Sequence, residues 1–110
     1  MTARRYEVGR WLVIEAQGEI DLMTAPLLSR LVDGVSSHLV FDLSRVTFID
    51  ARGLGLLAVT RAKLNGAHGS MSVAGPTPQT RKLLALTGLD RVVEVYDSLG
   101  EALWGHASCS

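Results

Sequence analysis

Three aspartates lie where strands of this chain end or lead into loops: Asp21, Asp42 and Asp50. If these strands belong to one sheet, the three carboxylates could meet at one edge and hold a divalent metal ion or form an acid–base pair. The simpler role for each aspartate is to cap a loop or to compensate the dipole of a following helix. We favour the simpler role, because three separate acidic residues are a weak metal-site signature.

Other patterns that support catalysis or cofactor binding are missing from the sequence. His38, His68 and His106 have no cysteine or second histidine at the spacing of a metal site. The chain has no Gly-x-Ser-x-Gly elbow and no glycine-rich loop that ends in Lys-Ser or Lys-Thr. The Gly-Leu-Gly run at 53–55 lacks the third glycine of a dinucleotide-binding fingerprint. We therefore expect no enzymatic activity, no cofactor and no metal.

The composition favours one intracellular domain, residues 1–110, because 47% of the 110 residues are hydrophobic. Lysine plus arginine and aspartate plus glutamate each total 11, so the formal net charge is zero and nucleic acid is not expected as a partner. No apolar run suits a signal peptide or a membrane span. The single cysteine, Cys109, cannot form an internal disulfide, which suits the reducing cytoplasm.

Strand and helix signals alternate along the chain. Two strands at 6–8 and 11–14, joined by a tight Gly9-Arg10 turn, predict an N-terminal β-hairpin. Further strands are expected at 38–43, 69–73 and 92–95, and helices at about 24–35, 50–66, 77–88 and 98–104. This alternation predicts an α/β fold with a mixed, mostly parallel β-sheet and about four α-helices. Residues from about 106 to 110 are expected to form a frayed tail.

The periodicity within the helices also predicts which residues are buried. Pro26 is tolerated only in a first helical turn, so Thr24 is the expected N-cap and Asp21 is left on the preceding loop. The expected core positions are Leu27, Leu28, Leu31, Val32 and Val35 in the first helix, Leu54, Leu57, Ala58 and Ala62 in the second, and Leu83, Leu84 and Leu86 in the third.

Residues 40–57 are the most informative segment. Asp50 follows a strand and can cap the second helix. Gly53 and Gly55 lie in its first turns, and each costs about 0.8–1 kcal/mol relative to alanine in a helix interior. Two such glycines require a reason, and the close approach of another backbone is the physical one.

Leu56 and Val59 lie on this helix beside the core stripe, in line with Arg52. The first two turns are therefore apolar on nearly all sides. Leu56 and Val59 either pack under a neighbouring loop or form an exposed apolar interface. We favour the interface, because glycines and apolar residues coincide at one end of the helix.

Several motifs resemble the STAS domain of bacterial anti-sigma-factor antagonists. The resemblance covers nearly the whole chain, and its most specific part is Asp50-x-x-Gly53-Leu54-Gly55. The other matching motifs are Gly18-Glu19-Ile20-Asp21 with Thr24, Phe48-Ile49, Gly69 with Met71-Ser72-Val73, Pro78, Leu83 and Thr87-Gly88-Leu89. The resemblance implies a mixed sheet with about four helices. It also implies a protein that binds an anti-sigma factor, an ATP-dependent serine kinase, so that a sigma factor is released.

Through this resemblance, the partner-binding surface is expected around the second helix and the loop before the first. The candidate residues are Asp21, Asp50, Ala51, Arg52, Gly53, Gly55, Leu56 and Val59. The family's block usually reads Asp-Ser-Ser-Gly-Leu-Gly, and the partner kinase phosphorylates the first serine to switch binding off. Ala51 occupies that position here and has no hydroxyl, so the resemblance implies an antagonist without this phosphorylation switch.

Two other functions stay open at this stage. The chain could be an accessory STAS subunit docked on the ATPase of a transporter, since such domains are also short and often lack the serine. It could also be a scaffold or decoy in a signalling assembly. In each case the ATP belongs to the partner, and we expect a cytoplasmic monomer or weak dimer that binds no nucleic acid and no membrane.

Overall fold

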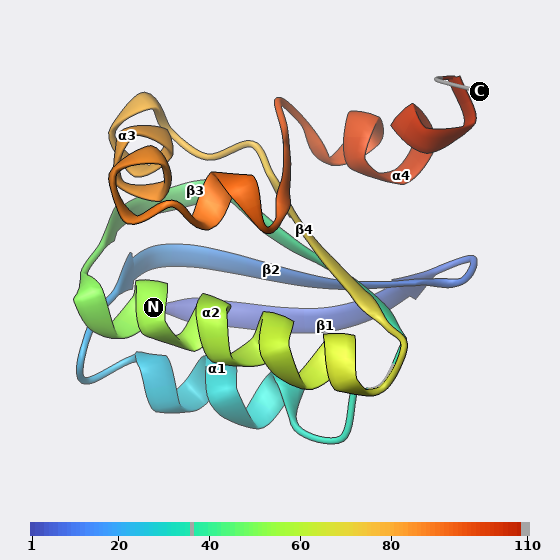
Figure 1. Cartoon of the computed structure of the whole chain (residues 1–110). Helices are drawn as coiled ribbons and strands as arrows, with labels where there is room; N and C mark the ends of the chain where they lie inside the picture. The colour runs from blue at the N-terminus through green and yellow to red at the C-terminus, as the bar shows by residue number, and fades with distance from the viewer. Residues whose placement is uncertain (36, 109–110) are drawn as a thin grey trace.

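Five strands form one mixed sheet: β1 (Thr2–Val8), β2 (Trp11–Ile20), β3 (His38–Ile49), β4 (Ser70–Ala74) and β5 (Glu94–Tyr96), in that spatial order (Figure 1). β1 and β2 form the predicted antiparallel hairpin, with a turn in which Gly9 takes a φ of 58°. The pairs β2–β3, β3–β4 and β4–β5 are parallel. The structure is a computed structural model that describes the backbone of residues 1–35 and 37–108 and side chains through Trp104.

Within the described residues, four α-helices flank the sheet: α1 (Ala25–Val32), α2 (Ala51–Gly66), α3 (Pro78–Thr87) and α4 (Leu99–Ser108). This confirms the predicted mixed α/β fold with about four helices. The backbone of α4 is described through Ser108, and the end of the expected frayed tail at about 106–110, including Cys109, lies outside the described residues. None of the described helices is long and apolar enough to cross a membrane.

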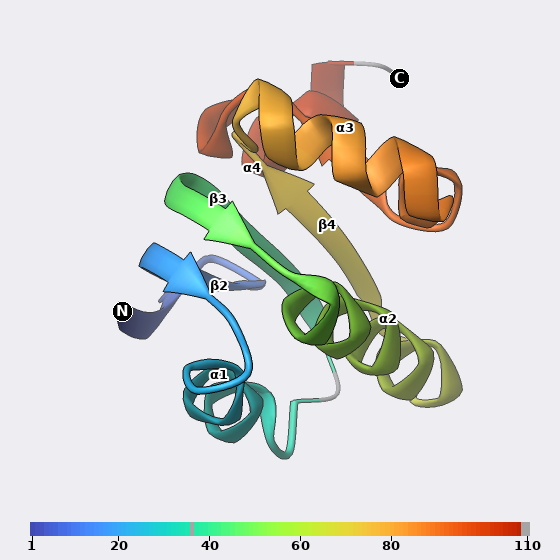
Figure 2. The ribbon, with the colours of Figure 1, turned by 90° about the vertical axis from the view of Figure 1, so that its left-hand side faces the viewer.

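The hydrophobic core has two clusters, one on each face of the sheet. The larger cluster joins the sheet to α1, α2 and α3, and includes Ile14, Phe41, Val73, Leu28, Leu57 and Leu84. The smaller cluster joins the opposite face to α4, and consists of Val13, Val40, Ala74 and Ala102. Figure 2 shows α1 and α2 together on one side of the strands and α4 on the other. Helices thus cover both faces of β3, as its apolar run predicts.

Side chains cap the starts of α3 and α4. Thr77 caps α3, because its Oγ1 accepts a hydrogen bond from the backbone N–H of Thr80 at 3.2 Å. At α4, Ser98 Oγ accepts from the N–H of Glu101 at 3.2 Å. The Glu101 carboxylate reaches back to the N–H of Asp97 at 3.2 Å, one residue before the position that a standard capping box uses.

Two positions predicted to be buried in α1 and α3 are exposed. Leu27 is 47% exposed and Leu86 is 73% exposed, so placing them in the core was wrong. Each helix buries a narrower face, on which Leu28 and Leu84 are fully buried. The reason is geometric, because a short helix that contacts the sheet on one side buries only a stripe of its surface.

The core face of α2 also differs from the predicted stripe. Ala58 and Ala62 are exposed, whereas Thr60 is only 3% exposed. A threonine can occupy this core position because its Oγ1 donates to the carbonyl of Leu56 at 2.8 Å, which satisfies the hydroxyl inside the helix. The buried residues of α2 are Gly53, Leu54, Leu57, Thr60 and Leu64.

Candidate functional site

The loop after β2 and the start of α2 are neighbours at one edge of the sheet. β2 and β3 pair as far as Ile20 and Ile49, whereas β4 pairs with β3 only over residues 38–42. The backbone N–H of Asp50 donates to the carbonyl of Ile20 at 3.0 Å. The parallel pairing therefore brings Asp21 and Asp50 to adjacent positions, although they are far apart in the sequence.

Asp21 shapes the loop between β2 and α1. Its Oδ1 accepts hydrogen bonds from the backbone N–H groups of Met23 and Thr24, at 3.0 and 3.1 Å. Thr24 precedes α1 as predicted, but its hydroxyl donates to the carbonyl of Glu19 at 2.8 Å and does not bond the helix. These bonds hold a tight turn. The turn leaves Leu22 and Met23 57% and 81% exposed.

Asp50 caps α2, as the sequence predicts. Its Oδ1 accepts from the backbone N–H groups of Arg52 at 2.9 Å and of Gly53 at 3.2 Å. Ala51 and Arg52 are the first two residues of the helix, and both are exposed. The cap therefore presents these two side chains to solvent at the positively polarised end of α2.

Gly53 and Gly55 have different surroundings. A Cβ on Gly53 would lie 2.5 Å from Cγ1 of Ile49 and 2.7 Å from Cγ2 of Ile20, whereas a Cβ on Gly55 would meet no atom within 4 Å. The predicted close approach therefore occurs only at Gly53, and it is against two isoleucine side chains of the sheet rather than another backbone. Gly55 instead leaves the surface beside it open.

An open groove with a volume of about 640 Å³ runs between α1 and α2. Val59 in this groove is 53% exposed. Leu56 is only half-buried, but it also packs against the main core, so treating Leu56 as a purely surface residue was wrong. The groove is lined by Leu22 of the loop, by Ala25, Pro26, Ser29 and Arg30 of α1, and by Ala51, Arg52, Gly55, Leu56 and Val59 of α2.

The groove combines an apolar floor with two cations. Arg30 and Arg52 form no ion pair with any residue that the structure describes. Unpaired guanidinium groups beside exposed apolar side chains can bind carboxylates of another molecule. The side chains of the groove are therefore chemically suited to contact with another molecule.

Asp42 lies apart from Asp21 and Asp50. It is in the middle of β3, between β2 and β4, and is only 6% exposed. Its Oδ1 accepts hydrogen bonds from the backbone N–H and the hydroxyl of Ser44, at 3.1 and 2.7 Å. Each of the three aspartates thus has a local structural role. No group of three potential metal ligands occurs among the residues that the structure describes.

Several residues in or beside the groove were not among the sequence candidates: Leu22 and the adjacent Met23 of the loop, and Ala25, Pro26, Ser29 and Arg30 of α1. Two consecutive apolar residues directly after Asp21 are the signal that could have identified the first two, because large apolar side chains in a loop often mark a binding surface. Arg30 carries no such signal. Its place beside Arg52 depends on how α1 packs against α2.

Comparisons with known proteins identify the family of the chain. The STAS domain family matches residues 2–102. The chain is 36% identical over 97 residues to the anti-sigma-F factor antagonist RsfB of Mycobacterium tuberculosis, a match that covers 84% of this chain and 79% of RsfB. It is 28% identical over 97 residues to the anti-sigma F factor antagonist of Paenibacillus polymyxa, covering 84% and 83% of the two chains.

A solved structure agrees as well. The crystal structure of an anti-sigma factor antagonist from Mycobacterium paratuberculosis matches with a TM-score of 0.86 and 36% sequence identity, covering 94% of this chain and 92% of that one. The family match over residues 2–102 includes both helices that line the groove. From its motifs, its fold and these relatives, the chain belongs to the STAS domain family.

Proposed function

We propose that this STAS domain is a non-enzymatic regulator that binds an anti-sigma factor and so releases a sigma factor. Its contact surface is the α1–α2 face, which we define as Leu22, Met23, Arg30, Arg52, Leu56 and Val59. The observation that carries the proposal is the gathering of exposed apolar side chains at this edge, with Met23 81%, Leu22 57% and Val59 53% exposed. The names of the relatives RsfB and the Paenibacillus protein support an anti-sigma factor as the partner.

The side chains of the α1–α2 face also predict the chemical character of the partner's surface. Burying a large apolar side chain stabilises a contact by about 1.5–3 kcal/mol, so Leu22, Met23 and Val59 can supply most of the affinity. Arg30 and Arg52 then favour carboxylates at the border of the partner's apolar patch. A partner segment with apolar residues flanked by aspartate or glutamate fits this arrangement.

Ala51 makes this binding independent of phosphorylation at the start of α2. The side chain is exposed in the first helical turn, where a kinase partner would reach it, but it has no hydroxyl. We therefore propose that the chain stays competent for binding in the presence of a partner that is an ATP-dependent serine kinase. It holds no cofactor of its own in this role.

The test uses the purified chain and the anti-sigma factor kinases encoded in the same genome. One of them is expected to bind the chain and to remain bound when ATP is added. An Ala51→Ser variant is expected to bind the same kinase, to gain one phosphate by mass spectrometry, and then to dissociate.

Two results would contradict the proposal. If no anti-sigma factor binds, and a transporter ATPase is captured instead, the family function assigned here is wrong. If the unaltered chain gains a stoichiometric phosphate, for example on Ser44 or Thr47, control by phosphorylation has moved to another residue.

A further inference from the structure

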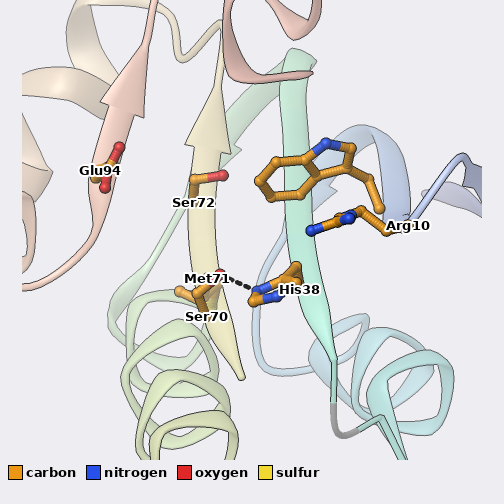
Figure 3. A pocket seen from close by; sticks show the side chains of 7 residues that line it. Arg10, His38, Ser70, Met71, Ser72 and Glu94 are labelled. Carbon is orange, nitrogen blue, oxygen red and sulfur yellow. Dashed lines mark hydrogen bonds between the residues drawn. The ribbon is translucent and has the colours of Figure 1, made fainter. Parts of the chain in front are cut away.

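A second pocket lies on the other face of the sheet, away from α1 and α2. It has a volume of about 280 Å³, and its lining includes Arg10, Trp11, His38, Ser70, Ser72 and Glu94 (Figure 3). The α1–α2 face uses none of these residues, and of them only Ser72 lies in a motif that resembles the STAS family. The pocket is therefore unexplained by the proposed function.

The pocket exists because α4 covers only part of this face. Side chains alternate along a strand, so Trp11 shares the face of Val13, and His38 shares the face of Val40. Val13 and Val40 are buried under α4. Trp11 and His38, two residues nearer the starts of their strands, are only half-buried.

Trp11 and His38 form one wall of the pocket. They are direct neighbours in the β2–β3 pairing, and their ring centroids lie 5.7 Å apart with the ring planes tilted by 57°. His38 Nδ1 and Ser70 Oγ are 2.7 Å apart, which holds the imidazole in place. A flat apolar ring can stack against such a wall.

Ser72 supplies an unused polar group inside the pocket. Its side chain is 5% exposed, and among the described residues its Oγ has no hydrogen-bond partner. Buried hydroxyl groups without a partner are rare, because losing hydration without compensation is unfavourable. A ligand atom that bonds Ser72 Oγ would remove this penalty.

The pocket has a cation on one side and a carboxylate on the other. The Arg10 guanidinium has no hydrogen-bond or ion-pair partner among the described residues, and Figure 3 shows it extending towards His38 on β3. Glu94 lies on β5 and accepts a hydrogen bond from the hydroxyl of Tyr96. β3 and β5 are separated by β4, a distance of about 10 Å. This spacing suits one aromatic ring with a polar group at each end.

We propose that this pocket binds a single-ring aromatic compound with an acidic group at one end and an amino group at the other. The ring stacks on Trp11 and His38, the acid pairs with Arg10, and the amino group donates to Glu94. Ser72, the direct neighbour of Glu94 in the β4–β5 pairing, accepts a hydrogen bond from the same amino group. The volume of about 280 Å³ suits a ligand with a single ring. The proposal is independent of anti-sigma factor binding, because the sheet separates the two surfaces.

The test is a titration of the full chain, labelled with ¹⁵N, with 4-aminobenzoate, benzoate and aniline, followed by two-dimensional NMR. 4-Aminobenzoate is expected to shift the amides of residues 10–11, 38, 70–72 and 94 in a saturable manner. Benzoate lacks the amino group and aniline lacks the acid, so each is expected to bind roughly tenfold more weakly.

One substitution and a matched control assign the acidic end of the ligand. Arg10→Ala is expected to weaken 4-aminobenzoate and benzoate by roughly tenfold while leaving aniline unchanged. Arg45→Ala, which removes an exposed cation farther along β3, is the control and should change none of the three. The proposal is overturned if no probe gives saturable shifts at millimolar concentration, if the three probes bind equally, or if the shifts map to the α1–α2 face.

Discussion

Gly53 and Gly55 lie two residues apart in α2. Helix propensity alone assigns the same energetic cost to both glycines. Their surroundings separate them, because Gly53 faces Ile20 and Ile49 whereas Gly55 faces open space. The same chemical change at the two positions should therefore have opposite effects on the free energy of unfolding.

Gly53→Ala is expected to destabilise the protein by about 1–3 kcal/mol, because the new methyl group overpacks a site between two buried isoleucines. That cost exceeds the helix-propensity gain of about 0.8–1 kcal/mol. Gly55→Ala should show only the gain and raise the stability by about 0.5–1 kcal/mol. Urea unfolding of both variants provides the measurement. Equal shifts in the same direction would mean that α2 does not approach the sheet as closely as described.

Arg52 places a positive charge at the positively polarised end of α2. Arg52→Ser removes this mismatch, so the stability is expected to rise by about 0.3–1 kcal/mol. The same variant should bind the anti-sigma factor about two- to fivefold more weakly at low salt, since a border ion pair contributes about 0.2–1 kcal/mol. The difference in affinity should shrink as salt increases.

Thermal melting and a salt-titrated binding assay test Arg52 together. Arg45→Ser serves as the matched control, because Arg45 is exposed on β3 and does not line the groove. If Arg52→Ser and Arg45→Ser bind equally well at every salt concentration, Arg52 has no role in the contact.

At the scale of elements, three sides of α2 have different surroundings. One side packs on the sheet through Leu54, Leu57 and Leu64. A second side lines the groove through Leu56 and Val59. The third side, with Ala58 and Ala62, faces solvent. One helix therefore offers both the interface positions and the controls needed to test it.

Val59→Asp is expected to weaken binding of the anti-sigma factor at least about tenfold, because a carboxylate would enter an apolar contact without a partner. Its melting temperature should stay close to that of the unaltered protein, since Val59 is 53% exposed. Leu56→Asp should lower both affinity and melting temperature, because Leu56 also contacts the core. Ala58→Asp should change neither. Loss of binding in Ala58→Asp would place the interface on a different side of α2.

At the scale of the whole molecule, the two faces of the sheet are covered unequally. α1, α2 and α3 contribute to the larger cluster, whereas Ala102 is the fully buried contribution of α4 to the smaller one among the described side chains. β3 lies at the centre, paired on both sides. Leu39, Val40 and Phe41 in β3 are all completely buried. Local stability should therefore decrease from β3 to α4.

Hydrogen exchange monitored by NMR measures this gradient. The amides of Leu39–Phe41 are expected to exchange slowest, and those of α4 at least about tenfold faster, a difference of about 1.4 kcal/mol in opening free energy. The experiment needs no partner, so it examines the fold alone. Equal protection of α4 and β3 would show that α4 contributes more to the core than Ala102, the buried residue among its described side chains, suggests.

The sequence alone was sufficient for the fold class, the hairpin, the Asp50 cap and the STAS family. These features depend on local patterns, because caps, turns and strand runs involve residues close together in the chain. The sequence did not predict correctly which residues of the helices are exposed. Periodicity placed Ala58 and Leu86 in the core, whereas both are exposed.

Only the tertiary structure decided how the site is assembled. The parallel register of β2 and β3 brings the loop of Leu22 and Met23 beside the start of α2. The packing of α1 against α2 then sets Arg30 and Arg52 along one groove. Neither arrangement can be predicted from local patterns, because strand pairing and helix packing depend on contacts between residues distant in sequence.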